Sequence, residues 1–269
     1  MVVDPSKYVE ARIVERRDHT RDLWTIRVAH DSDFTHKPGQ YATIGVVHED
    51  RVLERPYSIV SSPAEPTIEF LLELVPDGAL TPHLYPLQPG ARLLMRRRAK
   101  GLFLLDLPSQ RTHHLLLSTV TGVAPFVSMV RTLAHHRTEP LPEGLQIVCI
   151  QGGSQSHEFG YDRELIEFDR QCAWFHYIPT ISRHWEDPGW TGERGRVEDI
   201  IRKYTDMHGV TPETGIAYLC GHPGMISGGE AIMKRAGFDA KWVRQEEYWP
   251  AGKAPLDADE RAEAAAQTA

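Results

Sequence analysis

The sequence predicts two domains in one chain, an antiparallel β-barrel followed by a doubly wound α/β domain built on a parallel sheet. The 269 residues, 41% of them hydrophobic, suffice for two modest cores, since domains commonly run about 100 to 200 residues. From residue 8 to about residue 105, short apolar segments separated by turns indicate the barrel. After Pro108, apolar runs alternate with helical segments, which is typical of a parallel sheet.

Short strands are expected throughout the first domain, with proline–glycine turns such as Pro76-Asp77-Gly78 between them. Their expected ranges are 8–15, 23–28, 41–47, 55–60, 68–74 and 92–95. In the second domain, strands are expected at 114–118, 146–150, 174–180 and 215–219. Helices are expected at 125–136, 162–170, 197–204 and 223–236.

These elements divide the chain into a first domain of residues 1–108, a second domain of residues 109–250 and a tail of residues 251–269. The tail is rich in Ala, Glu and Asp and has no convincing apolar stripe. We therefore expect a solvated helix or a frayed terminus there rather than part of a core.

Composition argues against several classes of protein. The formal charge of -7 argues against a nucleic-acid binder, because a polyanion attracts a basic surface. The three cysteines, Cys149, Cys172 and Cys220, have the spacing of neither a disulfide framework nor a metal site. No apolar stretch of about 18 residues predicts a membrane span, and residues 1–17 lack the apolar core of a signal peptide. These features favour a cytoplasmic protein without a metal site.

The segment Arg55-Pro56-Tyr57-Ser58 lies where a strand should leave the barrel. A flavin dinucleotide could use Arg55 for its pyrophosphate, Tyr57 against the isoalloxazine ring and the Ser58 hydroxyl near N5. The alternative is an ordinary strand with a surface arginine and a core tyrosine.

The segment from Val75 to Leu84 combines a tight glycine turn at Gly78 with a hydroxyl at a helix start. With Thr81 as the helix cap, the backbone amides could bind the same pyrophosphate. A plain turn capped by Thr81 is the alternative.

Two segments of the second domain join a strand to a helix through small residues, which is the place of a nucleotide site in a doubly wound sheet. In Ser118-Thr119-Val120-Thr121-Gly122-Val123-Ala124-Pro125, Gly122 would let the backbone approach a ligand. In Tyr218-Leu219-Cys220-Gly221-His222-Pro223-Gly224-Met225, Cys220 is expected at the carboxyl edge of the sheet. The alternatives are an ordinary strand-to-helix turn in the first segment and a cysteine buried in the core in the second.

Taken in order, Arg-Pro-Tyr-Ser, Gly-x-x-Thr, Thr-Gly-Val-Ala-Pro-Phe and Cys-Gly-His-Pro-x-Met-Ile resemble the bacterial branch of the ferredoxin–NADP reductase family. The resemblance extends from Tyr8 to Trp249. It implies a six-stranded FAD barrel, a five-stranded parallel sheet that binds NADP(H), and transfer of hydride from NADPH to FAD followed by single electrons to ferredoxin or flavodoxin.

The resemblance also implies which residues contact the cofactors. The FAD positions are Arg55, Pro56, Tyr57, Ser58, Val75, Gly78, Leu80 and Thr81. The positions around the nicotinamide are Thr121, Gly122, Cys220, Gly221 and Met225. Tyr248 and Trp249 resemble an aromatic terminus that covers the flavin. Ser58 and Cys220 would orient the flavin and nicotinamide rings. Glu246 or Glu247, of which we choose Glu247, would supply a charge or transfer protons at the site.

NADP rather than NAD is expected because a 2′-phosphate needs cationic donors. Ser182, Arg183 and Arg196 occupy places that resemble the family's phosphate site. A further arginine of the family is absent, with Ser154 at about that place. Solvated surface arginines are the alternative.

Two departures from the family pattern matter. Val120 replaces the first glycine of Gly-Thr-Gly, and valine tolerates a positive φ poorly, so we expect that the turn differs or that this glycine served close packing. The chain also continues for 20 residues beyond Trp249, which puts stacking of the aromatic terminus in doubt.

The basic run Arg96, Arg97, Arg98 and Lys100 lies in an acidic chain and resembles the family's docking site for an acidic carrier protein. A solvated face is the alternative. Two other functions also stay open, namely the reductase component of an oxygenase and a flavin-binding electron-transfer or regulatory subunit without NADPH turnover.

Overall fold

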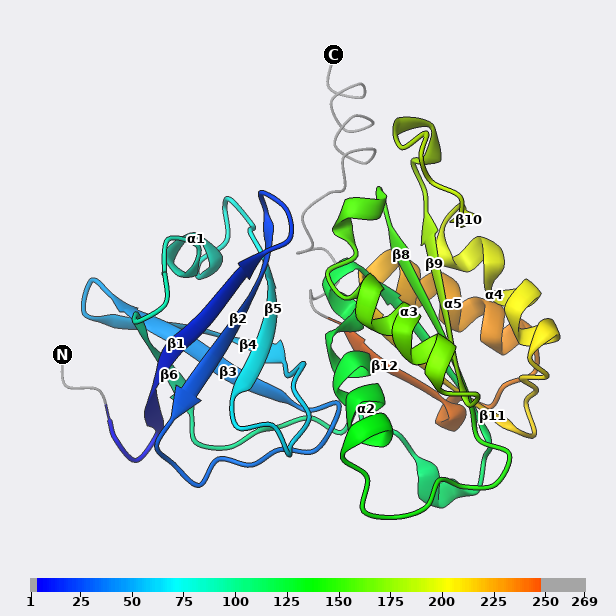
Figure 1. The fold of residues 1–269 in the computed structure, drawn as a ribbon, viewed down its shortest axis with the longest axis horizontal. Coiled ribbons are helices and arrows are strands. Elements are labelled where there is room, and N and C mark those ends of the chain that lie inside the picture. The colour runs from blue at the N-terminus through cyan, green and yellow to red at the C-terminus, as the bar shows by residue number, and fades with distance from the viewer. Residues whose placement is uncertain (1–3, 248–269) are drawn as a thin grey trace.

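The computed structural model describes residues 4–247, and the expected tail, Tyr248 and Trp249 lie outside the described residues. Within residues 4–247, two domains lie side by side, with the barrel formed by the first part of the chain (Figure 1). Among these residues, no helix is long and apolar enough to cross a membrane.

The first domain is a six-stranded antiparallel sheet in the order β4-β3-β6-β1-β2-β5. Its strands are β1 (Tyr8–Asp18), β2 (Leu23–His30), β3 (Tyr41–His48), β4 (Arg51–Ser58), β5 (Ile68–Glu73) and β6 (Arg92–Arg96). The two edges approach each other where Ile59 forms a bridge with Phe70. Val60 N donates to Glu69 O at 2.9 Å beside that bridge, so the sheet curls toward a barrel.

Alternation places the barrel core on one face of each strand. On β1, Val9, Ala11 and Ile13 are buried while their neighbours face solvent. Trp24 of β2 and Phe70 of β5 fill the interior with them. Strand β4 begins four residues before the expected range and ends two residues before its expected end, because the polar residues 51–54 pair with β3 in a hairpin.

Helix α1 (Thr81–Leu84) follows the glycine turn, and here the expected cap is wrong. The N-cap residue is Leu80, and no side chain caps the helix. The Thr81 hydroxyl instead accepts from Val75 N at 3.0 Å and lies 3.2 Å from Val75 O. Thr81 therefore closes the 75–81 loop on itself, because the chain turns back before the helix starts.

The second domain is an all-parallel sheet in the order β10-β9-β8-β7-β11-β12. Its strands are β7 (His113–Thr119), β8 (Gln146–Gly153), β9 (Phe175–Ile181), β10 (Glu193–Arg194), β11 (Gly215–Gly221) and β12 (Val243–Glu247). Helices α2 (Ala124–His135) and α3 (Asp162–Gln171) cover one face. Helices α4 (Val197–Met207) and α5 (Pro223–Arg235) cover the other (Figure 1).

The architecture confirms the expected fold class, with six parallel strands in place of five. The two edge strands, β10 and β12, were not predicted from the sequence, for a physical reason. Strand β10 has two residues, and β12 reads Val-Arg-Gln-Glu-Glu and pairs on one side only. An edge strand does not need the apolar run that marks a buried parallel strand.

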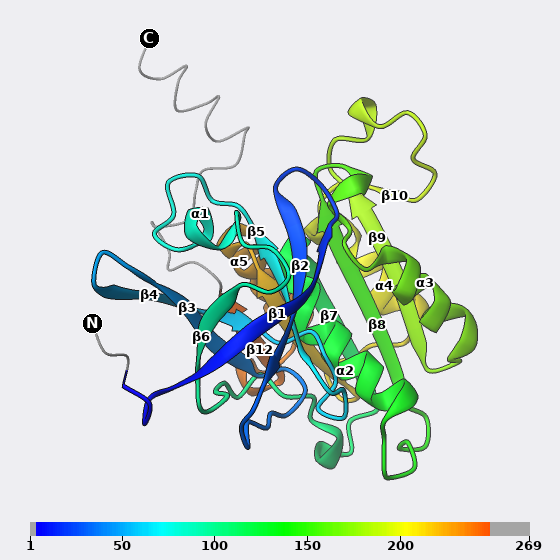
Figure 2. The same cartoon turned by 60° about the vertical axis from the view of Figure 1, so that its left-hand side comes forward.

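The two domains share a closed interface on one side of the molecule. Apolar residues Leu23, Val60 and Leu71 of the barrel belong to the same buried cluster as α2. Beside them, Arg131 Nη1 of α2 donates to Glu69 Oε2 of β5 at 2.6 Å, and the Arg131 side chain is only 9% exposed. This contact holds α2 against β5. Helix α2 lies on the barrel side of the parallel sheet (Figure 1 and Figure 2).

Candidate active site

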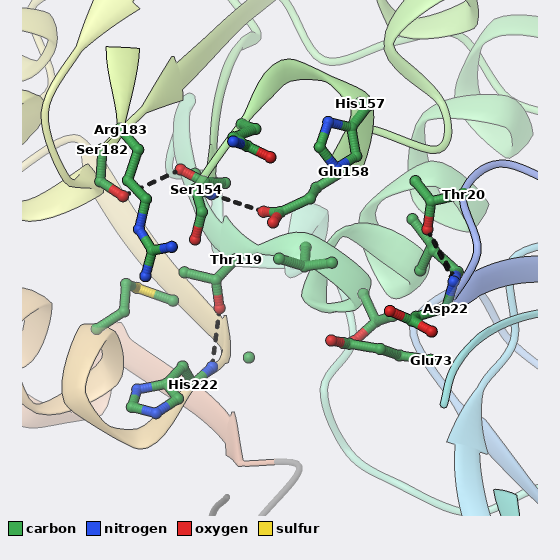
Figure 3. Close-up of a pocket in the computed structure, with 18 of the residues that line it drawn as sticks. Thr20, Asp22, Glu73, Thr119, Ser154, His157, Glu158, Ser182, Arg183 and His222 are labelled. Carbon is green, nitrogen blue, oxygen red and sulfur yellow. Dashed lines mark hydrogen bonds between the residues drawn. The ribbon is translucent and has the colours of Figure 1, made fainter. Parts of the chain in front are cut away.

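On the other side the domains leave a cavity of about 530 Å³ at the carboxyl edge of the parallel sheet. The ends of β7, β8, β9 and β11 form one wall, and the end of β5 with the β1–β2 turn forms the other. Figure 3 shows Arg183 on the first wall and Asp22 and Glu73 on the second. Ligands of open α/β sheets bind at this edge, where successive strands diverge.

The turn after β7 is a 3₁₀ segment, Val120–Val123, whose Val120 and Thr121 line the cavity. Val120 adopts φ +40°, so the turn keeps the left-handed residue that glycine would supply. Valine therefore adopts the positive φ that we expected it to tolerate poorly. The Val120 carbonyl accepts from Gln151 Nε2 at 3.1 Å, a contact that helps to hold this strained conformation.

Close backbone packing joins the ends of β7 and β11. A Cβ on Gly122 would lie 2.1 Å from Cys220 O, so only glycine fits there. His222 N donates to Thr119 Oγ1 at 2.9 Å, and Gly221 adopts φ +130° directly against Thr119. Thr119, which precedes the turn, was not among the expected site residues, although its place at a strand end marks it.

Ser182, Arg183 and Arg196 come together on the cavity wall, at the end of β9 and the start of α4. Ser182 N donates to Gly153 O, and Arg183 N donates to Ser154 O, both at 2.9 Å. These bonds continue the sheet beyond β9 and orient both residues toward the cavity. Two guanidinium groups and two serine hydroxyls form a donor set that suits a phosphate.

His222 also lines the cavity and was not expected there. Its Nδ1 accepts from Gly224 N at 3.1 Å, while its Nε2 is buried without a hydrogen-bond partner among residues 4–247. A buried donor without a partner costs free energy unless a ligand supplies an acceptor. Met225, expected at the nicotinamide, and Gly221 lie on the same wall.

Carboxylates face this donor set from the barrel side and from the turn after β8. Asp22 and Glu73 project from the barrel, and Glu158 lies above them (Figure 3). Glu158 accepts a hydrogen bond from Ser154 N at 2.6 Å. The Glu73 side chain is accessible to water in the open cavity, yet the surrounding walls and then the charges of Glu158 and Asp22 raise its pKa to about 7. Neither carboxylate of the barrel was expected in the site.

The end of β4 meets the end of β12 at a contact between the domains. Ser58 Oγ donates to Glu246 Oε1 at 2.9 Å, and Ser58 is buried. Burial raises the pKa of Glu246, and the Ser58 hydrogen bond opposes that rise. Of the two expected glutamates, Glu246 makes this contact, whereas Glu247 is exposed because successive strand residues face opposite sides; the catalytic role of Glu247 stays a prediction.

The other expected FAD residues surround this contact or the loop before α1. Arg55 and Pro56 are exposed on β4, and Tyr57 packs against the barrel core. Gly78 N donates to Val75 O at 2.9 Å within the turn that leads to α1. Burial raises the pKa of the Tyr57 hydroxyl, so that group stays protonated. The flavin roles of these residues stay predictions.

Cys220 lies on β11 beside Ser118 and Glu246, at the carboxyl edge as expected. Its side chain is fully buried in the cluster that contains Phe103 and Tyr218, and it does not line the cavity. A role beside the nicotinamide therefore stays a prediction.

The basic run divides into two pairs. Arg96 forms an ion pair with Glu54, which raises the pKa of Arg96, and Arg97 Nε donates to Pro5 O at 2.8 Å. Arg98 and Lys100 are exposed, and Leu102, which follows them, is 89% exposed.

Comparisons with known proteins agree with this architecture. The model of the oxidoreductase NAD-binding domain family matches residues 116–230. A ferredoxin–NADP reductase of Azotobacter vinelandii is 28% identical over 218 residues, which are 76% of this chain and 80% of that protein. The crystal structure of a ferredoxin NADP+ reductase from Neisseria gonorrhoeae with bound FAD and NADP has a TM-score of 0.78 and 21% identity, covering 90% of this chain and 99% of that one.

The chain is therefore similar in sequence to ferredoxin–NADP reductases over most of its length and shares the fold of one of them. It is also similar to a reductase that serves oxygenases. The ferredoxin–NAD(P)+ reductase component of naphthalene 1,2-dioxygenase and salicylate 5-hydroxylase systems from a Ralstonia species is 26% identical over 259 residues, which are 94% of this chain and 72% of that protein. These similarities confirm the expected resemblance to the ferredoxin–NADP reductase family.

Proposed function

We propose that this chain is an FAD-dependent oxidoreductase that takes hydride from NADPH and delivers single electrons to ferredoxin or flavodoxin. The observation that carries the proposal is the cavity at the sheet edge, which joins a phosphate-binding donor set to the Val120–Val123 turn. A cytoplasmic location accompanies this function.

The residues present fit both cofactors by their chemistry. Ser182, Arg183 and Arg196 supply hydroxyl and guanidinium donors for a 2′-phosphate, and the unpartnered His222 Nε2 supplies a further buried donor. On the barrel, Arg55 supplies a guanidinium for a pyrophosphate, with the Tyr57 ring beside it on β4. When bound, FAD accepts hydride from NADPH and returns electrons one at a time.

The chain's own residues hold the two reacting groups near each other. The Val120–Val123 turn and Gly221 line the cavity with backbone. Gly221 packs directly against Thr119, so no side chain at this position fills the space that a ligand needs. The Ser58–Glu246 hydrogen bond fixes the end of β12 to the end of β4, and it keeps a carboxylate at the junction of the domains. Glu246 can hold or release a proton there, since burial brings its pKa closer to neutrality.

The carrier protein would dock beside this junction. Lys100 and the exposed Leu102 flank Gly101, at which a Cβ would lie 3.7 Å from Glu246 Oε2. Together with Arg98, these residues offer positive charge around one apolar side chain, which suits an acidic electron carrier. Arg96 and Arg97 contribute less, because Glu54 and Pro5 already engage them.

Nucleotide selectivity tests the proposal. Arg183→Ala should weaken NADPH binding by about tenfold or more and leave NADH binding within about twofold, because only NADPH carries the 2′-phosphate. The measurement is the concentration dependence of flavin reduction by each nucleotide. Arg235→Ala, at the exposed end of α5, is the control. Equal losses for both nucleotides would remove the 2′-phosphate assignment.

A second candidate is the reductase component of an oxygenase, favoured by the match of 94% of the chain to the Ralstonia component. Residues 4–247 contain three free cysteines and no group of metal-binding side chains, whereas such reductases often carry an iron–sulfur domain. Rates of electron transfer to ferredoxin, flavodoxin and an oxygenase ferredoxin would distinguish the two functions.

A further inference from the structure

We propose that Glu73 makes nucleotide binding depend on pH, because its carboxylate opposes the phosphates of the bound nucleotide and must take up a proton for tight binding. This inference rests on the proposed function and concerns a residue of the barrel that faces the nucleotide cavity from the opposite domain.

Glu73 is the last residue of β5, and β5 packs against the Val120–Val123 turn. It lines the same cavity as Thr121, Arg183 and Arg196. Among residues 4–247, the Glu73 carboxylate has no hydrogen-bond or ion-pair partner. A nucleotide in this cavity therefore places its phosphates in a space that already contains an uncompensated negative charge.

The charged side chains that act on Glu73 are the carboxylates of Glu158 and Asp22. Asp22 lies on the β1–β2 turn, where its only charged partner among the described residues is the exposed Arg21 at 3.6 Å. Glu158 approaches from the turn after β8. The Val120–Val123 turn, which also packs against β5, contains no charged side chain. The other charged or titratable groups of the cavity are His157, Arg183, Glu186, Arg196, Glu198 and His222.

Enclosure by the walls and repulsion from Glu158 and Asp22 raise the pKa of Glu73 to about 7 in the free protein. A bound polyanion raises it further, because nearby negative charge disfavours the carboxylate. Below about pH 7 the carboxyl is protonated in both states, so affinity does not depend on it. Above that pH, binding draws a proton onto Glu73 and affinity falls as pH rises. The 2′-phosphate itself titrates near pH 6, so it does not contribute to the pH dependence of affinity above pH 7.

Calorimetric titration with NADP+ between pH 6.5 and 9 tests the inference without turnover, and pairs of buffers with different ionisation enthalpies give the proton uptake. The dissociation constant of the wild type should rise by about tenfold across this range, with an uptake of about half a proton between pH 7 and 8 and little uptake at pH 9. Glu73→Gln should bind NADP+ with nearly constant affinity, about tenfold more tightly than the wild type at pH 9.

Two further variants sharpen the test. Glu73→Asp keeps a carboxylate and should keep a pH dependence, and Asp22→Asn removes a neighbouring charge and should move the transition to lower pH. Glu143→Gln, which changes net charge equally on an exposed loop before β8, should follow the wild type.

The inference is overturned if Glu73→Gln shows the wild-type affinity and the wild-type pH dependence. Failure of the wild type to bind NADP+ at any pH is a different outcome, because it contradicts the proposed function itself and removes the Glu73 inference with it.

Discussion

Glu69 and Glu73 lie four residues apart on β5 and therefore point to the same face of the barrel, yet the second domain meets them in opposite ways. Glu69 is buried and accepts hydrogen bonds from Arg27 and Arg131, each at 2.6 Å, and from Tyr161 at 2.7 Å. Glu73 faces an open cavity with Asp22 and Glu158 as neighbours.

The difference separates the two roles of a domain interface. Where each buried carboxylate has guanidinium partners, the charges are compensated and the surfaces close. Where carboxylates remain uncompensated opposite phosphate donors, the surfaces stay apart and leave room for a ligand that carries charge of its own. The same strand therefore provides a structural contact at one end and a part of the site at the other.

Arg131→Met should break the closed contact and have the largest effect. It removes the guanidinium partner of Glu164 and one of the two guanidinium partners of Glu69, and removing one member of a buried ion pair costs about 3 to 5 kcal/mol. Denaturant unfolding measures the loss. Arg170→Met removes an arginine that is 74% exposed and should change stability by less than about 0.5 kcal/mol. Similar losses of unfolding free energy in both variants would show that the buried contact stabilises the protein no more than the exposed one.

A third contact between the domains, Ser58–Glu246, should matter for rate rather than for stability. Glu246→Gln weakens the acceptor that holds Ser58, so we expect flavin reduction by NADPH to slow by about tenfold or more with FAD still bound. Glu247→Gln, one residue further on the exposed face of β12, should retain the wild-type rate. Stopped-flow absorbance measures both variants, and slowing by Glu247→Gln alone would assign the role to Glu247 instead of Glu246.

Glu73→Gln should affect stability only at higher pH. The raised pKa means that the protonated carboxyl stabilises the fold below its ordinary pKa of 4.5, and this contribution is lost as pH rises to about 7. The variant and the wild type should therefore unfold at the same temperature near pH 4.5, and above pH 7 the variant should unfold about 1 to 3 °C higher. Water in the cavity screens the charge and keeps the effect small. A variant less stable at pH 8 would contradict the uncompensated charge at Glu73.

Substitutions of Val120, on the opposite wall of the cavity, should have the smallest effect on stability. At most positions alanine is more stable than glycine, but Val120 adopts φ +40°. Val120→Gly should therefore be more stable than Val120→Ala by about 1 kcal/mol, because glycine alone adopts this conformation without strain. Thermal unfolding of the two variants gives the difference, and the ordinary order would mean that the turn relaxes.

Most of the fold follows from local pattern. Helices α2 to α5 begin and end within three residues of their expected ranges, because apolar spacing and turn residues mark them. Strand β12 could not be predicted from Val-Arg-Gln-Glu-Glu, since its pairing with β11 depends on the completed sheet. The sequence could not show which of Glu246 and Glu247 contacts Ser58 for the same reason, because a shift of one residue moves a side chain to the other face.

The roles of the charged residues at the domain interface could not be predicted from the sequence around them. Arg131 lies in the middle of α2, 62 residues from Glu69, and Glu73 ends a strand like any solvated glutamate. Only the packing of the barrel against the second domain makes one a buried partner and leaves the other in the cavity. The positive φ of Val120 was likewise hidden, because the sequence argues against it.

An anaerobic visible spectrum of the purified chain, recorded before and after addition of NADPH and separately of NADH, tests the central claim most directly. The account predicts a yellow flavin spectrum that NADPH bleaches readily and NADH slowly. A colourless protein that does not take up added FAD, or a bound flavin that NADPH leaves oxidised, would contradict it.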